Sequence, residues 1–309
     1  MDELTDDLKA SLADLGRSLE WSYGADTAHT ELTAQERDAL HSLEKRLYRL
    51  VIPNRFKLPP KLYHYTDERG IAGILSSHGI RATYARDLLD EQEIRWGFAM
   101  VDTAMQFYRG KLENPQLREL LGLLYYSFVE FELQQEYYIA CFTECGDSER
   151  HWAEYGCADT GVVIEFDSFG LEQPSATFLD LQPVSYPVQE QADLVSEIVL
   201  ACWGSTLELV RGTPSERYWV WLPHTMSLLS SHLHYHLSRL KREEFAWEKE
   251  WRIIVRGAKP IDVLTGVKRF SHIPLLKTPN LSPILGITAR RTESGLALRE
   301  LIRSHGFVA

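Results

Sequence analysis

The sequence has few cysteines and no long apolar run. Four cysteines in 309 residues are too few for the disulfide framework of a small secreted domain. No run approaches the roughly 18 consecutive apolar residues that a membrane-spanning helix needs. The chain starts with the acidic segment MDELTDD, the reverse of a secretory signal. We therefore expect a cytoplasmic protein with reduced thiols and no membrane partner.

Basic residues are also scarce relative to acidic ones. The chain has 33 Lys and Arg against 44 Asp and Glu, which gives a formal net charge of -11 at pH 7. Because phosphate binding requires clustered Lys and Arg, this balance argues against a general nucleic-acid coat protein, although a local basic groove stays open. The length suits one large domain or two modest ones.

Several familiar motifs are missing from the sequence. We find no Walker loop, no dinucleotide-binding glycine fingerprint, no nucleophile elbow and no kinase motif set. Ser-His-Asp catalysis therefore has no anchoring motif, and the chemistry must be sought in less regular patterns.

The first 55 residues carry a helical period. Leucines recur every three or four residues over 8–19 and again over 40–50. Between them, Thr33 and Glu36 have the spacing of a capping box. Prolines at 53, 59 and 60 then end the helical pattern. We predict an N-terminal helical extension over residues 1–55, followed by one domain over residues 56–309.

The rest of the chain predicts strands separated by helices. The expected strands cover 62–66, 80–83, 137–143, 161–166, one or two stretches within 177–188, 252–255 and 284–288. The expected helices cover 68–77, 87–109, 115–134, 148–155, 193–210, 223–244 and 293–305. This order predicts an α+β fold with helices inserted between the strands of one sheet.

His64 lies in the middle of a predicted strand, between two tyrosines, where an apolar residue would be easier to bury. Because side chains alternate along a strand, Tyr63 and Tyr65 point away from the face that His64 shares with Leu62 and Thr66. A histidine beside a threonine suits the wall of a polar site. The alternative is a core histidine whose ring bonds a backbone carbonyl.

Glu248 and Glu250 stand at the start of a late apolar strand. If this segment is extended, both carboxylates lie on one face, where their repulsion raises a pKa unless a cation or a substrate hydroxyl lies between them. Arg252 falls on the same face and can pair with Glu250. The arrangement indicates either a functional site or a solvated strand start with a salt bridge.

The segment 141–157 is dense in reactive side chains. It contains Cys141, Cys145, His151 and Cys157. These residues have the chemistry of zinc ligands, but their spacing matches no known knuckle, so we predict no metal. Asp147 or Ser148 is expected to cap a helix that displays Trp152 and Tyr155 on one face. The two rings can clamp a flat ligand or pack against the core.

Two further polar groups have simpler explanations. His232 and His236 are four residues apart in the sequence HLHYH and can share a metal on a helix. No third ligand is near them in sequence, so a solvated or interface helix is expected. Four acidic residues between positions 87 and 93 suit either magnesium binding or a helix start that the helix dipole favours.

Several blocks of sequence occur together in one order. They are Tyr63–Thr66, Gly70–Leu75, Gly79–Arg81, Leu89–Glu93, Cys141–Glu144, Gly161–Asp167, Glu248–Arg252 and Ile284–Gly286. In this order, over about residues 62–305, the chain resembles the bacterial family called domain of unknown function 2971. The name of that family supplies no activity.

A second resemblance is more distant. The strand with His64 and Thr66, the helix ending in Ile74-Leu75 and the next strand resemble the first block of the ADP-ribosyltransferases. The late Glu-x-Glu is similar to the catalytic glutamate motif of that superfamily. The resemblance implies a split β-sheet and NAD as substrate, with His64 on a ribose hydroxyl, Glu250 as the catalytic residue and Glu248 assisting it.

The same resemblance implies further contacts with NAD. Tyr65 and Thr66 would line the nicotinamide end, Tyr155 would stack on the ring, and Arg81 or Arg252 would face the phosphates. The middle motif of the superfamily has three candidates here, namely Tyr84, Tyr155 and Ser168.

The implied reaction is transfer of ADP-ribose to a macromolecular acceptor, protein or nucleic acid, in the setting of a bacterial toxin or an anti-phage defence factor. Two alternatives stay open. One is a non-catalytic sensor that binds a nucleotide in the same cleft. The other is a metal-dependent nuclease or hydrolase that uses Asp90, Glu93 and the late glutamates.

Overall fold

The structure is a computed structural model of the whole chain. It describes residues 31–51, 58–87, 91–132, 137–156, 161–171, 179–256, 270–275, 283–290 and 296–304. The predicted helix over 8–19 therefore lies outside the described residues. The chain divides into a helical unit, Met1–Pro53, Arg95–Gln134 and Pro187–Leu237, and a sheet unit, Asn54–Ile94, Gln135–Tyr186 and Ser238–Ala309.

This division differs from the predicted boundary near residue 55. The long helices inserted between the strands gather with the N-terminal helix, whereas the short helices over 68–77, 149–155 and 168–171 stay with the sheet. The physical reason lies in their packing: within the helical unit, helix α9 contacts α2, α5 and α8. A boundary drawn along the sequence cannot express two units whose segments alternate.

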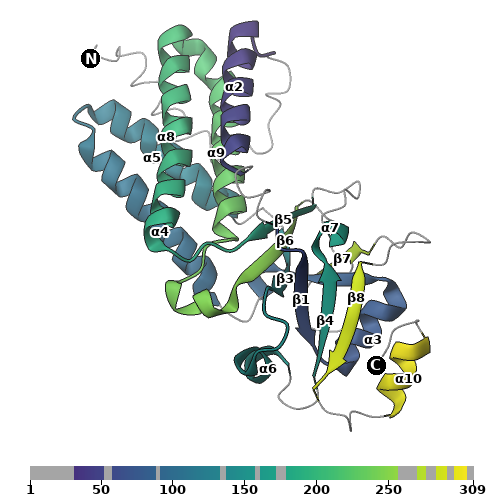
Figure 1. The fold of residues 1–309 in the computed structure, drawn as a ribbon. Coiled ribbons are helices and arrows are strands. Elements are labelled where there is room, and N and C mark those ends of the chain that lie inside the picture. The colour runs from purple at the N-terminus through teal and green to yellow at the C-terminus, as the bar shows by residue number, and fades with distance from the viewer. Residues whose placement is uncertain are drawn as a thin grey trace. The chain divides into compact units, whose positions relative to one another are not determined.

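The helical unit consists mainly of long helices (Figure 1). They are α2 (Ala34–Val51), α5 (Pro115–Glu132), α8 (Val188–Gly212), the 3-10 helix η3 (Ser215–Arg217), α9 (Tyr218–Leu237) and most of α4 (Glu91–Lys111). The predicted capping box is confirmed, since the Thr33 amide donates to Glu36 Oε2 at 2.7 Å and the Glu36 amide donates to Thr33 Oγ1 at 3.2 Å. No helix among the described residues is long and apolar enough to cross a membrane.

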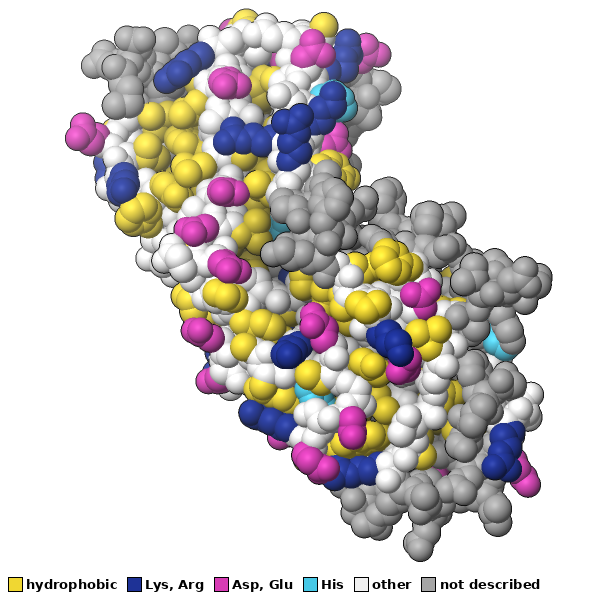
Figure 2. Space-filling view, in the orientation of Figure 1, with side chains coloured by type: hydrophobic (Ala, Val, Ile, Leu, Met, Phe, Trp, Pro, Cys, Tyr) yellow, Lys and Arg dark blue, Asp and Glu magenta, His cyan; other side chains and the backbone are white. Residues whose placement is uncertain are grey.

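Some hydrophobic side chains of this unit stay exposed. Tyr126 and Val129 on α5 and Leu200 on α8 are among them. Figure 2 shows hydrophobic side chains gathered on the face where α5 and α8 lie. On the same view, Lys and Arg side chains are interspersed with Asp and Glu.

The sheet unit contains an antiparallel sheet, which establishes the α+β class. Its strands are β1 (Lys61–Thr66), β2 (Gly79–Tyr84), β3 (Tyr137–Thr143), β4 (Val162–Asp167), β5 (Leu179–Pro183), β6 (Glu250–Arg256), β7 (Phe270–Pro274) and β8 (Ile284–Ala289). Their order is β5-β6-β3-β1-β4-β8, and β2 joins through β3 and carries β7. The predicted strands all occur, and β7 is an additional one.

The sheet divides between its two central strands. β1 pairs with β4 along its whole length, and β3 pairs with β6 along its whole length. Between β1 and β3, however, only Tyr63 and Thr143 pair. Beyond that point the two strands diverge, and side chains instead of a backbone ladder occupy the opening.

One face of the sheet carries the main core. Helices α3 (Glu68–Ser77) and α10 (Leu296–Ser304) contribute Ile71 and Ile302 to it, where they meet Leu62 and Trp251 from the strands. Asp67 caps α3 by accepting from the Gly70 amide. Because Trp251 and Ile253 of β6 face this core, Glu250 and Arg252, which alternate with them, are left on the other face.

The opposite face carries helix α6 (Glu149–Tyr155) and short segments. Ser148 caps α6, as predicted, and Trp152 packs there with Tyr65 and Val163. The short elements of the unit are η2 (Ala85–Asp87), α7 (Ser168–Leu171) and η4 (Glu243–Glu248).

One predicted helix has different ends. Instead of covering 223–244, α9 begins at Tyr218 and contains Pro223, and it ends at Leu237. The chain after it is extended, with Leu240 bridged to Ser185 and the Ser185 amide bonded to the Arg239 carbonyl at 2.8 Å. This turn out of the helix carries Lys241 to the sheet.

Candidate functional site

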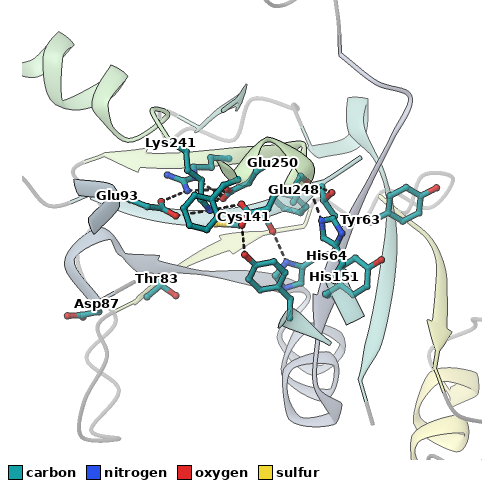
Figure 3. Close-up of a pocket in the computed structure, with 16 residues that line it drawn as sticks. Tyr63, His64, Thr83, Asp87, Glu93, Cys141, His151, Lys241, Glu248 and Glu250 are labelled. Atoms are coloured by element: carbon teal, nitrogen blue, oxygen red, sulfur yellow. Dashed lines mark hydrogen bonds and ion pairs between the residues drawn. The ribbon is translucent and has the colours of Figure 1, made fainter. Parts of the chain in front are cut away.

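The polar face of the sheet unit holds a cavity of about 330 Å³, at the lower end of the roughly 300–1,000 Å³ typical of small-molecule pockets. It lies beside the opening between β1 and β3 (Figure 3). The cavity is lined by Tyr63, His64, Tyr65, Thr83, Asp87, Glu93, Cys141, Phe142, Thr143, His151, Tyr155, Lys241, Phe245, Glu248, Glu250 and Arg252. All of these residues belong to the sheet unit.

His64 lies at the division of the sheet. Its Nδ1 is 2.8 Å from the carbonyl oxygen of Cys141, a group that β1 does not pair with by its backbone. Because a carbonyl can only accept, Nδ1 carries the proton and the neutral ring keeps Nε2 as an acceptor. Burial lowers the pKa of His64, which favours this neutral form. Both sequence interpretations hold in part, since the ring bonds a carbonyl and also lines the cavity.

Glu248 and Glu250 reach the same cavity, but not by strand alternation as predicted. Glu248 ends the 3-10 helix η4, Lys249 adopts a left-handed conformation with φ 44°, and β6 begins at Glu250. The turn at Lys249 therefore aims both carboxylates at one place. The Thr143 hydroxyl fixes this turn by donating to the Glu248 carbonyl at 2.6 Å.

A cation lies between the two carboxylates. Lys241 Nζ is 2.5 Å from Glu248 Oε2, 3.2 Å from Glu250 Oε2 and 2.7 Å from Oε1 of Glu93. The expected repulsion between two neighbouring glutamates is thus offset by an ammonium group of the chain itself. Figure 3 shows Lys241 and Glu93 on the same side of the cavity.

Arg252 completes this network. Its Nε donates to Glu250 Oε1 at 2.7 Å and its Nη2 to Glu250 Oε2 at 3.0 Å, which confirms the predicted pair. Nη2 also donates to Glu93 Oε2 at 2.5 Å, and Nη1 donates to the Ser238 carbonyl at 2.8 Å. We call the five residues Glu93, Lys241, Glu248, Glu250 and Arg252 the charged cluster.

Charges of the cluster move the pKa values of its members. Burial alone would raise the pKa of Glu250, but Arg252 and Lys241 outweigh it and lower that pKa to about 2. Burial raises the pKa of Glu248, and the opposing effect of Lys241 and of the Tyr155 hydroxyl does not cancel the rise. The pKa of Lys241 is raised because Glu250 and Glu93 outweigh its burial. Glu250 is therefore ionised at neutral pH.

Trp152 and Tyr155 do not clamp a ligand together. Trp152 is buried, with its ring 4.9 Å from that of Tyr65, and belongs to the small core under α6. Tyr155 is 44% exposed and lines the cavity, where its hydroxyl donates to Glu248 Oε1 at 2.6 Å. Of the three middle-motif candidates, Tyr155 alone lines this cavity, since Tyr84 and Ser168 are buried elsewhere.

Two of the predicted NAD contacts do not line the cavity. Thr66 packs its hydroxyl against the first turn of α3 at Gly70. Arg81 lies on the same face of β2 as Thr83 but nearer the start of the strand, with its guanidinium 4.7 Å from the Phe270 ring centre. Arg252 does line the cavity, but its donors are engaged by carboxylates and a carbonyl, so a role on phosphates is not supported.

The prediction of a solvated helix around His232 and His236 is wrong, because the structure buries these side chains. His232, His234 and His236 are buried in α9 because that helix is surrounded by α2, α5 and α8. Among the described residues, no group of three His, Cys, Asp or Glu side chains is arranged to hold a metal ion. Cys157, Leu89 and Asp90 lie outside the described residues.

Sequence reasoning placed Glu93 beside the late glutamates only as a metal ligand of a nuclease or hydrolase, whereas in the structure Glu93 pairs with Lys241 and Arg252. It missed Lys241 altogether, because a predicted helix over 223–244 would have kept that residue on a helix surface. His151 was weighed only as a zinc ligand. Its Nε2 is 3.3 Å from the Glu248 carbonyl, and burial lowers its pKa.

Comparison with known proteins supports one of the two resemblances. Residues 151–253 match the model of the family described as protein of unknown function (DUF2971). The matched stretch includes most of α6, all of η4 and four of the five residues of the charged cluster, Glu93 being the exception. No curated protein and no solved structure matches the chain. The family description names no activity, so the function has to be argued from the geometry.

Proposed function

We propose that the protein is an ADP-ribosyltransferase that binds NAD in the cavity of the sheet unit and transfers ADP-ribose to a macromolecular acceptor. The observation that carries this proposal is the convergence of His64, Glu248 and Glu250 on one cavity. His64 comes from the first sequence segment of the sheet unit, and the two glutamates come from its last segment. The division of the sheet at this point agrees with the split sheet that the resemblance implies.

The chemistry of the cavity suits the proposed reaction. The bond between nicotinamide and ribose C1′ breaks, nicotinamide leaves with the bonding electron pair, and the acceptor forms a bond to C1′ and loses a proton. The ribose becomes positively charged in the transition state. Glu250, which is ionised at neutral pH, supplies a fixed negative charge for it in a largely buried site.

His64 and Tyr155 supply positioning. The Nε2 acceptor of His64 suits a ribose hydroxyl, and the Cys141 carbonyl holds the ring in that orientation. Tyr155, at the cavity wall and half exposed, offers an aromatic face to the nicotinamide ring. Glu248, whose pKa is raised, is the carboxylate that can exchange a proton with the acceptor.

The test uses the full chain and NAD labelled on adenine. We expect release of nicotinamide and transfer of label to protein or nucleic acid in a cell extract. Glu250→Gln should lower nicotinamide release by roughly 100-fold or more, because the variant keeps the shape of the side chain and removes its charge. Thermal unfolding should show that the variant is folded.

Glu154→Gln is the matched control. Glu154 is exposed on α6, beside Tyr155, and does not line the cavity. This variant should release nicotinamide as fast as the parent. Equal release from parent and Glu250→Gln, or no release from the parent at any NAD concentration, would reject the transferase proposal.

A second candidate function is a non-catalytic nucleotide sensor. It is favoured by the ion pairs of the charged cluster, because both oxygens of Glu250 are already bonded to cations of the chain. Calorimetric titration with NAD separates the two candidates. Heat of binding without release of nicotinamide supports the sensor, whereas binding with release supports the transferase.

A further inference from the structure

The chain passes between its two units several times, and three of these crossings lie among the described residues. They are at 94–95 within α4, at 186–187 just before α8, and at 237–238 at the end of α9. Next to each crossing, on the side of the sheet unit, a residue belongs to the charged cluster or bonds it. The crossings are therefore covalent links between the helical unit and the cavity.

The residues beside the crossings hold Glu250 and its arginine. Glu93 lies next to the first crossing and accepts from Arg252 Nη2 at 2.5 Å. Tyr186 precedes the second crossing, and its hydroxyl accepts from the Glu250 amide at 2.9 Å. Ser238 follows the third crossing, and its carbonyl accepts from Arg252 Nη1 at 2.8 Å. The position of Glu250 thus depends on all three segments.

On the other side of the crossings, α4 contacts α8 and α9 within the helical unit. Trp96 Nε1 donates to Gln191 Oε1 of α8 at 2.8 Å. Gly97 is buried and faces Leu237, the last residue of α9. A Cβ at Gly97 would lie 3.1 Å from both Cβ and Cδ2 of Leu237. Because carbon atoms in contact are usually about 3.5–4.0 Å apart, the glycine is what lets α4 come this close to the end of α9.

The close contact at Gly97 lies one helical turn from the charged cluster. Gly97 and Glu93 are four residues apart on α4 and so share a face of that helix. Leu237 is followed directly by Ser238. Glu93 and Ser238 in turn both bond Arg252. A displacement of α4 from the end of α9 therefore draws Glu93 away from the guanidinium.

We infer that Gly97 is a positioning residue, through which the packing of the helical unit sets the place of the carboxylates in the cavity. The inference deepens the proposed function by giving the helical unit control over the site, and it rests on that function only for the roles of Glu248 and Glu250. Glu93 transmits the effect, because it shares Lys241 with both late glutamates. When Glu93 moves away, Lys241 is left to those two alone.

The test measures the pKa of Glu248 in the full chain without NAD, by infrared titration of the carboxyl groups with Glu248→Gln as the blank. Glu93→Gln should lower this pKa and weaken proton binding about tenfold, because Lys241 is then shared by fewer carboxylates. Gly97→Val should weaken it about threefold, because its side chain pushes α4, and Glu93 with it, away from Leu237. Adding Glu93→Gln to Gly97→Val should weaken it only about threefold further, instead of tenfold.

Leu43→Ala is the control. Leu43 is 1% exposed on α2, in the helical unit and away from the described crossings. The variant should destabilise the helical unit by leaving a cavity in its core, and it should leave the pKa of Glu248 unchanged. If Gly97→Val does not fold, Gly97→Ala, which adds only the Cβ, decides the matter and should lower the same pKa.

Three outcomes overturn the inference. They are an unchanged Glu248 pKa in Gly97→Val or in Glu93→Gln, a full tenfold effect of Glu93→Gln in the Gly97→Val background, and an equal change of this pKa in Leu43→Ala. A lowered pKa in Gly97→Val, in a parent chain that releases no nicotinamide from NAD, supports the positioning and rejects the transferase alone. Release of nicotinamide by the parent, with an unchanged pKa in Gly97→Val, rejects the positioning alone.

Discussion

The two units of the chain each bury a carboxylate against a guanidinium, and the two arrangements differ in what the carboxylate does. In the helical unit, Glu36 is fully buried and accepts from Arg217 Nε at 2.7 Å and Nη2 at 2.5 Å. It also accepts from the Thr33 amide and so closes the start of α2. One carboxylate therefore meets one guanidinium, and Glu36 Oε2 also caps the start of the helix.

In the sheet unit, Glu250 is also bound by an arginine, but it belongs to a cluster with more acids than bases and lies at a cavity wall. Both carboxyl groups have a pKa of about 2, lowered by the guanidinium beside each. A lowered pKa by itself therefore does not separate a structural carboxylate from a functional one. The surroundings of the two carboxylates differ, because Glu36 is held between Thr33 and Arg217 at a helix start, whereas Glu250 lines a cavity with His64 and Tyr155.

The largest expected loss of stability follows from a substitution in the charged cluster. Arg252→Met should lower the free energy of unfolding by about 3–5 kcal/mol, because Glu250 and Glu93 are left buried without their guanidinium. Urea unfolding followed by circular dichroism measures this. Arg242→Met is the control, since Arg242 pairs at the surface with an exposed Glu244 and should cost about 1 kcal/mol or less. Equal losses in both variants would show that the cluster does not hold the sheet unit.

The Glu36–Arg217 pair should contribute less to the free energy of unfolding than the charged cluster does. Glu36→Gln keeps the capping oxygen and loses the charge, so we expect a loss of about 1–2 kcal/mol in the free energy of unfolding. The parent should hold this stability above pH 4.5 and lose it as the pH falls toward 2, because the folded state keeps Glu36 ionised. Acid titration of parent and variant should therefore converge at low pH. A constant difference down to pH 2 would contradict the assignment.

The lowered pKa of His64 predicts that the free energy of unfolding also depends on pH at milder acidity. Burial holds its pKa below 6.5, so the unfolded chain takes up a proton more readily than the folded one. Stability should be complete above pH 6.5 and should decrease below it, by at most about 1.4 kcal/mol per pH unit. His64→Gln should flatten this part of the curve between pH 6.5 and 5. A curve of the same slope in the variant would place the titration elsewhere.

The smallest effect concerns Tyr155. Tyr155→Phe removes one hydrogen bond to Glu248 from a half-exposed side chain, and should cost about 0.5–1 kcal/mol. The Tyr155 hydroxyl also holds the Glu248 pKa down, so the variant should raise that pKa further. Infrared titration of the carboxyl groups, with Glu248→Gln as the blank, measures the change. A lowered Glu248 pKa would show that the hydroxyl acts as an acceptor instead.

Local patterns in the sequence predicted most of the fold. The capping box at Thr33 and Glu36, the helix over 68–77 and the strand over 137–143 all occur where they were expected. These features depend on neighbours a few residues away, such as hydrophobic period and cap chemistry. The end of α9 was mispredicted, because the apolar and aromatic period continues beyond Leu237 while a bridge to Ser185 draws the chain away.

The sequence by itself singled out polar side chains at β1 and at the start of β6, because His64 and Glu250 are costly to bury in a strand. Only the tertiary structure decided which of the other residues join them. Glu93 and Lys241 enter the site through contacts between segments far apart in the chain, and the left-handed turn at Lys249 aims Glu248 at the same point. The net charge of the site and the pKa values of its carboxyl groups depend on that assembly, because the cations beside Glu248 and Glu250 come from other segments of the chain.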